Sequence, residues 1–220
     1  VGEYYKSRVS QISYDARDIE SFILAHANKT YTEQQWTRLG IFTGALVSAL
    51  TQKEKQTTIS VDLGHRTFHY LFGWTRHANN IMVKNLTGNH AFYWAGSNEG
   101  RVGNITGINI TGHSAFEFAG SDEGSVGNIT GINITGHFAF WRVGGYKGNV
   151  EHITGINITG DLTFWDAGGA EGHVSVLKYY EIIGLIKWSR TAYIHQKVLL
   201  TPQQAREYPE IVSACKSSHV

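Results

Sequence analysis

The twelve residues VGNITGINITGH occur twice with identical sequence, at Val102–His113 and at Val126–His137, so the two copies lie 24 residues apart. Eight of these residues return at the same spacing as ITGINITG, at Ile153–Gly160. Self-similarity at a fixed period of about 20–50 residues is typical of solenoids, propellers and other repeat arrays, in which each unit buries its apolar side chains against the next unit. The repeat therefore restricts much of this chain of 220 residues to such an array.

Glycines divide each unit into short segments rich in β-branched and aromatic residues. In the second copy these segments are Val126–Thr130, Ile132–Thr135 and Phe138–Val143, which predicts three short strands per turn. The apolar alternation breaks between Ile129 and Ile132, and a corner at Gly131 explains that break without a bulge. The pattern favours a right-handed parallel β-helix, and an antiparallel hairpin repeat remains the alternative.

The predicted fold is mainly β, a 24-residue-repeat β-solenoid over residues 56–175 with an N-terminal helical cap over residues 1–55. The cap is predicted from helical spacing of Ile19, Phe22, Ile23 and His26, and from capping boxes that begin at Thr30 or Thr32. Such a cap would cover the apolar core and unpaired backbone of the first turn. Residues 176–220 are expected to add strands, a short helix at Pro202 and a polar tail.

Charge and cysteine content exclude several classes of function. The chain has 19 Lys and Arg against 18 Asp and Glu, a balance that does not favour nucleic acid as a partner. Its one cysteine, Cys215, excludes an internal disulfide framework and suggests an interchain disulfide. No cofactor is predicted. A membrane is a less favoured partner, because the uncharged segment 39–51 is too short to span a bilayer alone.

Seven Asn-x-Thr sequons and a first residue other than Met predict a secreted, extracellular glycoprotein. Five of the seven belong to the repeated phrase, so Asn28 and Asn85 are the candidate glycosylation sites. The repeated asparagines, which include Asn109 and Asn133, are expected to form ladders of amide hydrogen bonds along the solenoid axis.

A column of phenylalanines at the 24-residue spacing predicts the core: Phe92, Phe116, Phe140 and Phe164. The next residue in each unit should point outward, which assigns a ligand-binding row to Tyr93, Glu117, Trp141 and Trp165. A corner column holds His113, His137 and Asp161, which could bind a metal or titrate near neutral pH.

Coil length, stacked Asn and stacked Phe over Gln56–Ser175 resemble the pectate-lyase-like β-helices, although no lyase or hydrolase signature accompanies the likeness. A polysaccharide lyase or glycoside hydrolase, with Asp161, Asp166 and Glu171 as the acids, is one alternative. The sequons and late cysteine are also similar to those of secreted killer-toxin chains, which gives a membrane-active toxin subunit using the 33–51 helix as another. The preferred function is non-enzymatic binding of a cell surface, a glycan or copies of itself through the aromatic row.

The repeat predicts how the chain tolerates deletions. Removal of Asn104–Gly127 takes out one whole turn and rejoins the same columns, whereas removal of twelve residues breaks every column. We expect the whole-turn deletion to melt cooperatively by circular dichroism and the half-turn deletion to be unfolded or insoluble. Equal folding of the two variants would contradict the solenoid.

Overall fold

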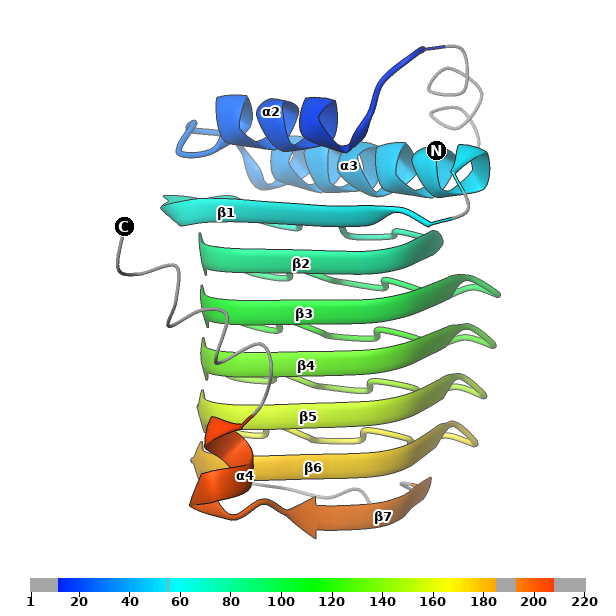
Figure 1. Ribbon diagram of the computed structural model, residues 1–220, viewed down its shortest axis with the longest axis vertical. Coiled ribbons are helices and arrows are strands. Elements are labelled where there is room, and N and C mark those ends of the chain that lie inside the picture. Colours follow the sequence, from blue (N-terminus) through cyan, green and yellow to red (C-terminus); the bar gives the residue numbers. More distant parts are fainter. Residues whose placement is uncertain (1–11, 55, 185–192, 208–220) are drawn as a thin grey trace.

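The computed structural model describes residues 12–54, 56–184 and 193–207. Within these residues seven strands form one parallel sheet in chain order, and they stack into a solenoid of about six turns (Figure 1). The strands are β1 (Thr58–Thr67), β2 (His77–Thr87), β3 (Arg101–Thr111), β4 (Ser125–Thr135), β5 (Asn149–Thr159), β6 (His173–Ile183) and β7 (Tyr193–Leu199). The predicted β-solenoid is confirmed, and the antiparallel hairpin repeat is wrong.

The strand register follows the sequence period. Ile105 pairs with Ile129 and Ile129 with Ile153, so equivalent residues of successive units lie directly above one another. The ladder continues through β6 and β7, beyond the boundary expected at residue 175. The strands after that boundary are therefore further turns of the same solenoid.

Each repeat in the described chain contributes one long strand, so the prediction of three short strands is wrong. Gly131 is not a corner: it lies inside β4 and faces the interior, where a Cβ atom would come within 2.7 Å of Phe140 Cζ. The break in alternation falls two residues later, at Asn133, whose φ of 54° is left-handed. Ile132 and Ile134 consequently face opposite sides of the sheet, whereas alternation had placed them on the same side.

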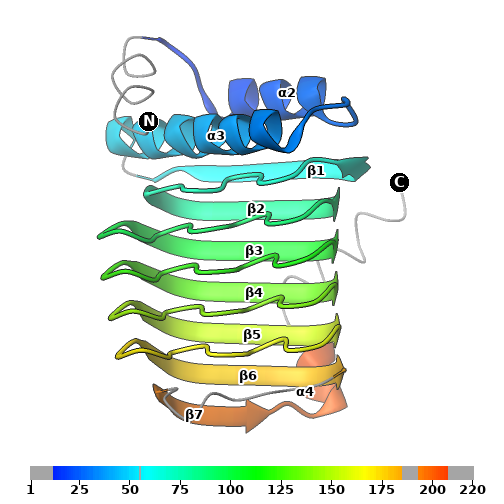
Figure 2. The same cartoon turned by 180° about the vertical axis from the view of Figure 1, so that it is seen from behind.

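The return path of each repeat is a wall of tight turns, visible in front of the sheet in Figure 2. Backbone hydrogen bonds link these turns along the axis, as in Phe116 N–H to Ala139 O at 2.8 Å. The far end closes with two consecutive left-handed residues, Asp122 and Glu123 in the third turn, with Gly124 N–H donating to Ser121 O. This pattern is typical of a type I′ turn, which reverses the chain within two residues.

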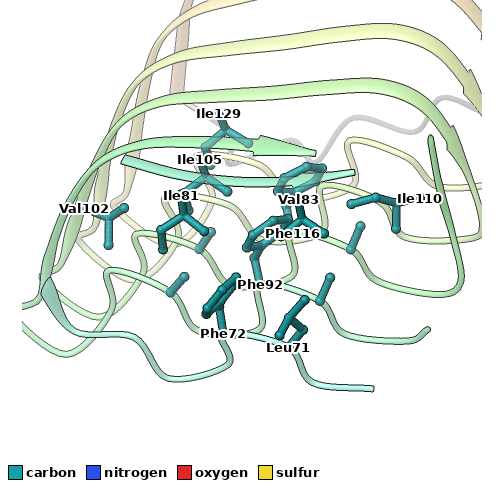
Figure 3. Close-up of a cluster of buried hydrophobic side chains, with 14 of the residues drawn as sticks. Leu71, Phe72, Ile81, Val83, Phe92, Val102, Ile105, Ile110, Phe116 and Ile129 are labelled. Atoms are coloured by element: carbon teal, nitrogen blue, oxygen red, sulfur yellow. The ribbon is translucent and has the colours of Figure 1, made fainter. Parts of the chain in front are cut away.

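The core lies between the sheet and this back wall (Figure 3). The four phenylalanines predicted for it are fully buried and stack with centroid distances of 4.8–5.1 Å. Isoleucines of the strands, such as Ile105 and Ile129, face these rings from the sheet side. The ring spacing matches the separation of neighbouring strands, so one stack runs through the four turns that begin with β2, β3, β4 and β5.

Two helices, α2 (Ala16–His26) and α3 (Glu33–Lys53), cover the first turn as the sequence predicts. Of the two possible capping boxes the structure uses Thr32 with Gln35. Gly40 and Gly44 of α3 face the first back-wall turn so closely that a Cβ atom would meet the carbonyl oxygens of Tyr70 and Gly73. No helix in the described part of the chain is long and apolar enough to cross a membrane.

The opposite end is built differently. A short helix, α4 (Pro202–Arg206), packs on the outer face of the sheet, where Ala205 joins Ile132 and Ile156 in a second apolar cluster. The core column that runs through Ile153 and Leu177 ends at an exposed lysine, Lys197 of β7. A charged side chain at a core position of the last strand disfavours the addition of another strand.

Gly131 gives a test of this packing. Gly131→Ala should lower the free energy of unfolding by about 1–3 kcal/mol, because the added methyl group meets the Phe140 ring. Phe140→Leu makes room, so we expect the double variant to lose less than the sum of the two single losses. Urea unfolding measures all three, with Ser125→Ala in the same strand as control. Strict additivity would show that the two side chains do not compete for space.

Candidate functional site

Outward side chains of the back wall form a continuous set of rings across five turns, which we call the aromatic band. Its members belong to three columns and include one carboxylate. They are Tyr70, Trp74, His90, Tyr93, Trp94, Glu117, Phe118, Phe138, Trp141 and Trp165. Left-handed residues at Tyr70, Trp74, His90 and Trp94 build the first two turns, and equivalent positions repeat below them.

The upper part of the band surrounds Tyr93. Its ring lies nearly perpendicular to the rings of Trp74, His90 and Phe118, at interplanar angles of 75–85° and centroid distances of 5.1–5.9 Å. Tyr70 stacks on His90 at 4.8 Å. The rings around Tyr93 therefore meet it edge to face, the Tyr70 and His90 rings stack, and together these contacts fix the ring orientations.

Glu117 places a carboxylate inside this aromatic surrounding. It is only 5% exposed, and its Oε2 lies 3.0 Å from Nδ1 of His90. Burial raises the pKa of the neighbouring Tyr93 phenol, and the charge of Glu117 raises it further. The site thus combines a nearly buried hydrogen-bond acceptor with a phenol that keeps its proton at neutral pH.

The lower part of the band is a stack. The indole rings of Trp141 and Trp165 lie 5.6 Å apart and almost parallel, so their facing surfaces contact each other and are closed to a ligand. Arg142 lies over the Trp141 ring and pairs with Asp166 at 3.2 Å. Trp141 Nε1 is buried and has no hydrogen-bond partner among the described residues.

The four residues predicted as a ligand-binding row are therefore on one surface but in two environments. Tyr93 and Glu117 lie at the polar upper part, and Trp141 and Trp165 form the stack below. The sequence did not reveal the other two outward columns of the band, which lie on either side of this row. Strand alternation would place Arg142, in one of these columns, on the same side as Phe140. In the structure a φ of 52° at Arg142 turns it outward.

The corner column has a structural role that its residue types explain. His69 Nδ1 accepts the backbone N–H of Asn89 at 3.1 Å, and Asn89 Oδ1 accepts that of His113 at 3.0 Å. His137 Nδ1 accepts from Asp161 in the same way at 3.4 Å, and the His113 and His137 rings stack at 5.3 Å. Within the described ranges no three His, Cys, Asp or Glu side chains gather to hold a metal ion.

The asparagine ladders form as predicted and use the amide groups of the sequons. Asn133 Nδ2 donates to Asn109 Oδ1 at 2.8 Å, and Asn85 Nδ2 donates to Asp62 Oδ1 at 2.9 Å. Asn28 differs: it is exposed, and its Oδ1 accepts the Thr67 N–H while its own N–H donates to Thr67 O. Its Nδ2 takes no part in these bonds, which favours Asn28 over Asn85 as a glycan acceptor.

The three acidic residues considered for a lyase or hydrolase do not lie together in one site. Asp161 lies at the corner, Asp166 faces Arg142 in the back wall, and Glu171 lies at the far turn of the same repeat. Cys215 lies outside the described residues.

Comparison with protein-family models, curated proteins and solved structures finds no match for this chain. The aromatic band and its surroundings are therefore the features of this chain that bear on its function.

The ladder geometry predicts which sequon is used. On expression in a eukaryotic secretory host we expect one glycan, at Asn28, because the other sequon amides are engaged in stacked hydrogen bonds. Thr30→Ala removes this sequon without touching the two Asn28–Thr67 bonds, and it should abolish the mobility shift caused by glycosidase treatment. Thr87→Ala, which removes the Asn85 sequon, should leave that shift unchanged; modification at Asn85 would contradict the prediction.

Proposed function

We propose that this chain is a secreted, non-enzymatic binding protein that recognises a neutral glycan through the aromatic band. The observation that carries the proposal is the nearly buried carboxylate of Glu117, held by His90 within a ring of aromatic side chains. Burial of a charged acceptor costs free energy. A buried carboxylate is therefore retained where a specific polar partner compensates for that cost.

The chemistry of a sugar matches both components of the site. Its C–H groups are apolar and pack against aromatic rings and ring edges, whereas its hydroxyl groups donate hydrogen bonds to carboxylates. Tyr93 adds a phenol, and the stack of Trp141 and Trp165 extends the apolar surface by two further turns. A ligand that spans several sugar units therefore suits the length of the band.

Charge favours a neutral ligand over an acidic one. Residues 80–175 contain four basic and eight acidic residues. Arg142, which lies beside the band over the Trp141 ring, already pairs with Asp166, and Glu117 would repel a uronate or sialate carboxylate.

The geometry gives less support to self-assembly, to a membrane-active toxin and to a carbohydrate-active enzyme. Helices cover one end of the solenoid and Lys197 lies at the other, so end-to-end assembly of copies is disfavoured. The 33–51 segment turns Gly40 and Gly44 toward the solenoid rather than toward a membrane. Hydrolysis by a carboxylate pair needs two acids that converge on one bond, and Asp166 is paired with an arginine.

The proposal predicts that neutral oligosaccharides bind and that the band carries the affinity. With neutral hexasaccharides of glucose, mannose and galactose as probes, Glu117→Gln should weaken binding at least about fivefold, equivalent to about 1 kcal/mol. Trp141→Ala combined with Trp165→Ala should give a loss of similar size by removing apolar contact. Isothermal titration calorimetry measures both losses.

Glu123→Gln is the matched control, since it removes a carboxylate from an exposed turn of the same repeat. Each variant is first melted by circular dichroism, and a fall of a few degrees is expected for the double tryptophan variant because both rings are half-buried. Tighter binding of an oligouronate, or unchanged affinity in Glu117→Gln, would contradict the proposal.

A further inference from the structure

A cavity of about 250 Å³ lies where the helical cap meets the solenoid. One side of this junction pocket is formed by Tyr31 of the loop before α3 and by Glu33 and Trp36 at the start of α3. The first two back-wall turns form the other side. Tyr70 and His90 of those turns also belong to the aromatic band, so the pocket opens onto the band's upper end.

The apolar lining is built from rings held at fixed angles. Tyr31 meets Trp36 edge to face at 4.9 Å and 87°, and Trp36 meets His69 at 5.3 Å and 65°. Trp36 is buried and also packs on the core ring of Phe68 at 5.0 Å, which ties the pocket to the rigid interior. These walls are therefore formed before a ligand arrives.

The polar lining has defined protonation and orientation. His69 Nδ1 accepts the N–H of Asn89, and burial lowers the pKa of His69, with the nearby His90 lowering it further. The neutral ring then carries its proton on Nε2, which makes it a donor. Glu33 supplies a carboxylate that accepts the Tyr70 hydroxyl at 3.3 Å.

We propose that the junction pocket binds the terminal sugar ring of a neutral glycan, and that the following units extend along the aromatic band. The inference rests on the proposed function for the identity of the ligand. The volume of about 250 Å³ lies just below the range of about 300–1,000 Å³ that is typical of pockets for drug-sized ligands, which suits a single hexose ring. Aromatic walls with one carboxylate and an imidazole donor match the C–H groups and hydroxyls of such a ring.

Monosaccharide probes measure binding to the junction pocket separately from binding to the aromatic band. The probes are the methyl glycosides of glucose, mannose and galactose, with methyl glucuronide as the acidic comparison. Binding is followed by the indole N–H resonance of Trp36, which is assigned by its disappearance in Trp36→Phe. We expect at least one neutral glycoside to shift this resonance saturably at millimolar concentration, and methyl glucuronide to leave it unmoved.

Two conservative substitutions test the polar lining of the junction pocket. Glu33→Gln removes the charge, and His69→Asn keeps an acceptor for the Asn89 N–H because asparagine serves the same purpose one turn below. Each should weaken the methyl glycoside at least about fivefold. Glu99→Gln, at a far turn, is the control and should leave affinity unchanged.

The outcomes separate this inference from the proposed function. The double alanine variant of Trp141 and Trp165 should weaken the hexasaccharide and leave the methyl glycoside unaffected. Hexasaccharide binding that depends on Glu117 while no monosaccharide moves the Trp36 resonance would overturn the pocket and leave the band standing. Absence of binding by every neutral probe would overturn both.

Discussion

The stack of phenylalanine rings in the core is the interaction on which the rest of the structure depends. Their spacing of 4.8–5.1 Å equals the distance between hydrogen-bonded strands, so side-chain stacking and the backbone ladder require the same repeat. The rings also dictate the opposite wall: glycine stands at 107, 131 and 155 because any larger side chain would meet a ring. One residue type thus fixes both the axial spacing and the thickness of the solenoid.

The functional surface follows from how the chain returns across this thin core. A strand would present every second residue outward, but the back wall consists of turns with left-handed residues, and it presents three outward columns per repeat. Aromatic residues occupy most of these positions, and the third turn interrupts them with Ser114 and Glu117. The interruption places the nearly buried carboxylate of Glu117 beside His90 of the turn above, and the His90 ring also packs on Tyr93.

Polar ladders also connect the turns outside the core. Asparagines at the left-handed bends of β2, β3, β4 and β5 hydrogen-bond to one another along the axis, and corner residues accept the next backbone N–H. Asparagine suits the bend because it tolerates a positive φ and carries both a donor and an acceptor. The dense sequons are therefore explained by structure, and Asn28, outside the ladders, is the exception.

The sequence by itself determined the 24-residue period, the phenylalanine core and the helical cap, because stacked identical residues and local capping chemistry do not depend on distant contacts. It did not determine the number of strands per turn, the side on which Ile132 or Arg142 lies, or the junction pocket. The first two are set by φ at single residues, such as Asn133, where one left-handed bend reverses every later side chain. The pocket joins α3 to turns more than thirty residues away, and only packing of the cap on the first turn decided which rings and polar groups meet there.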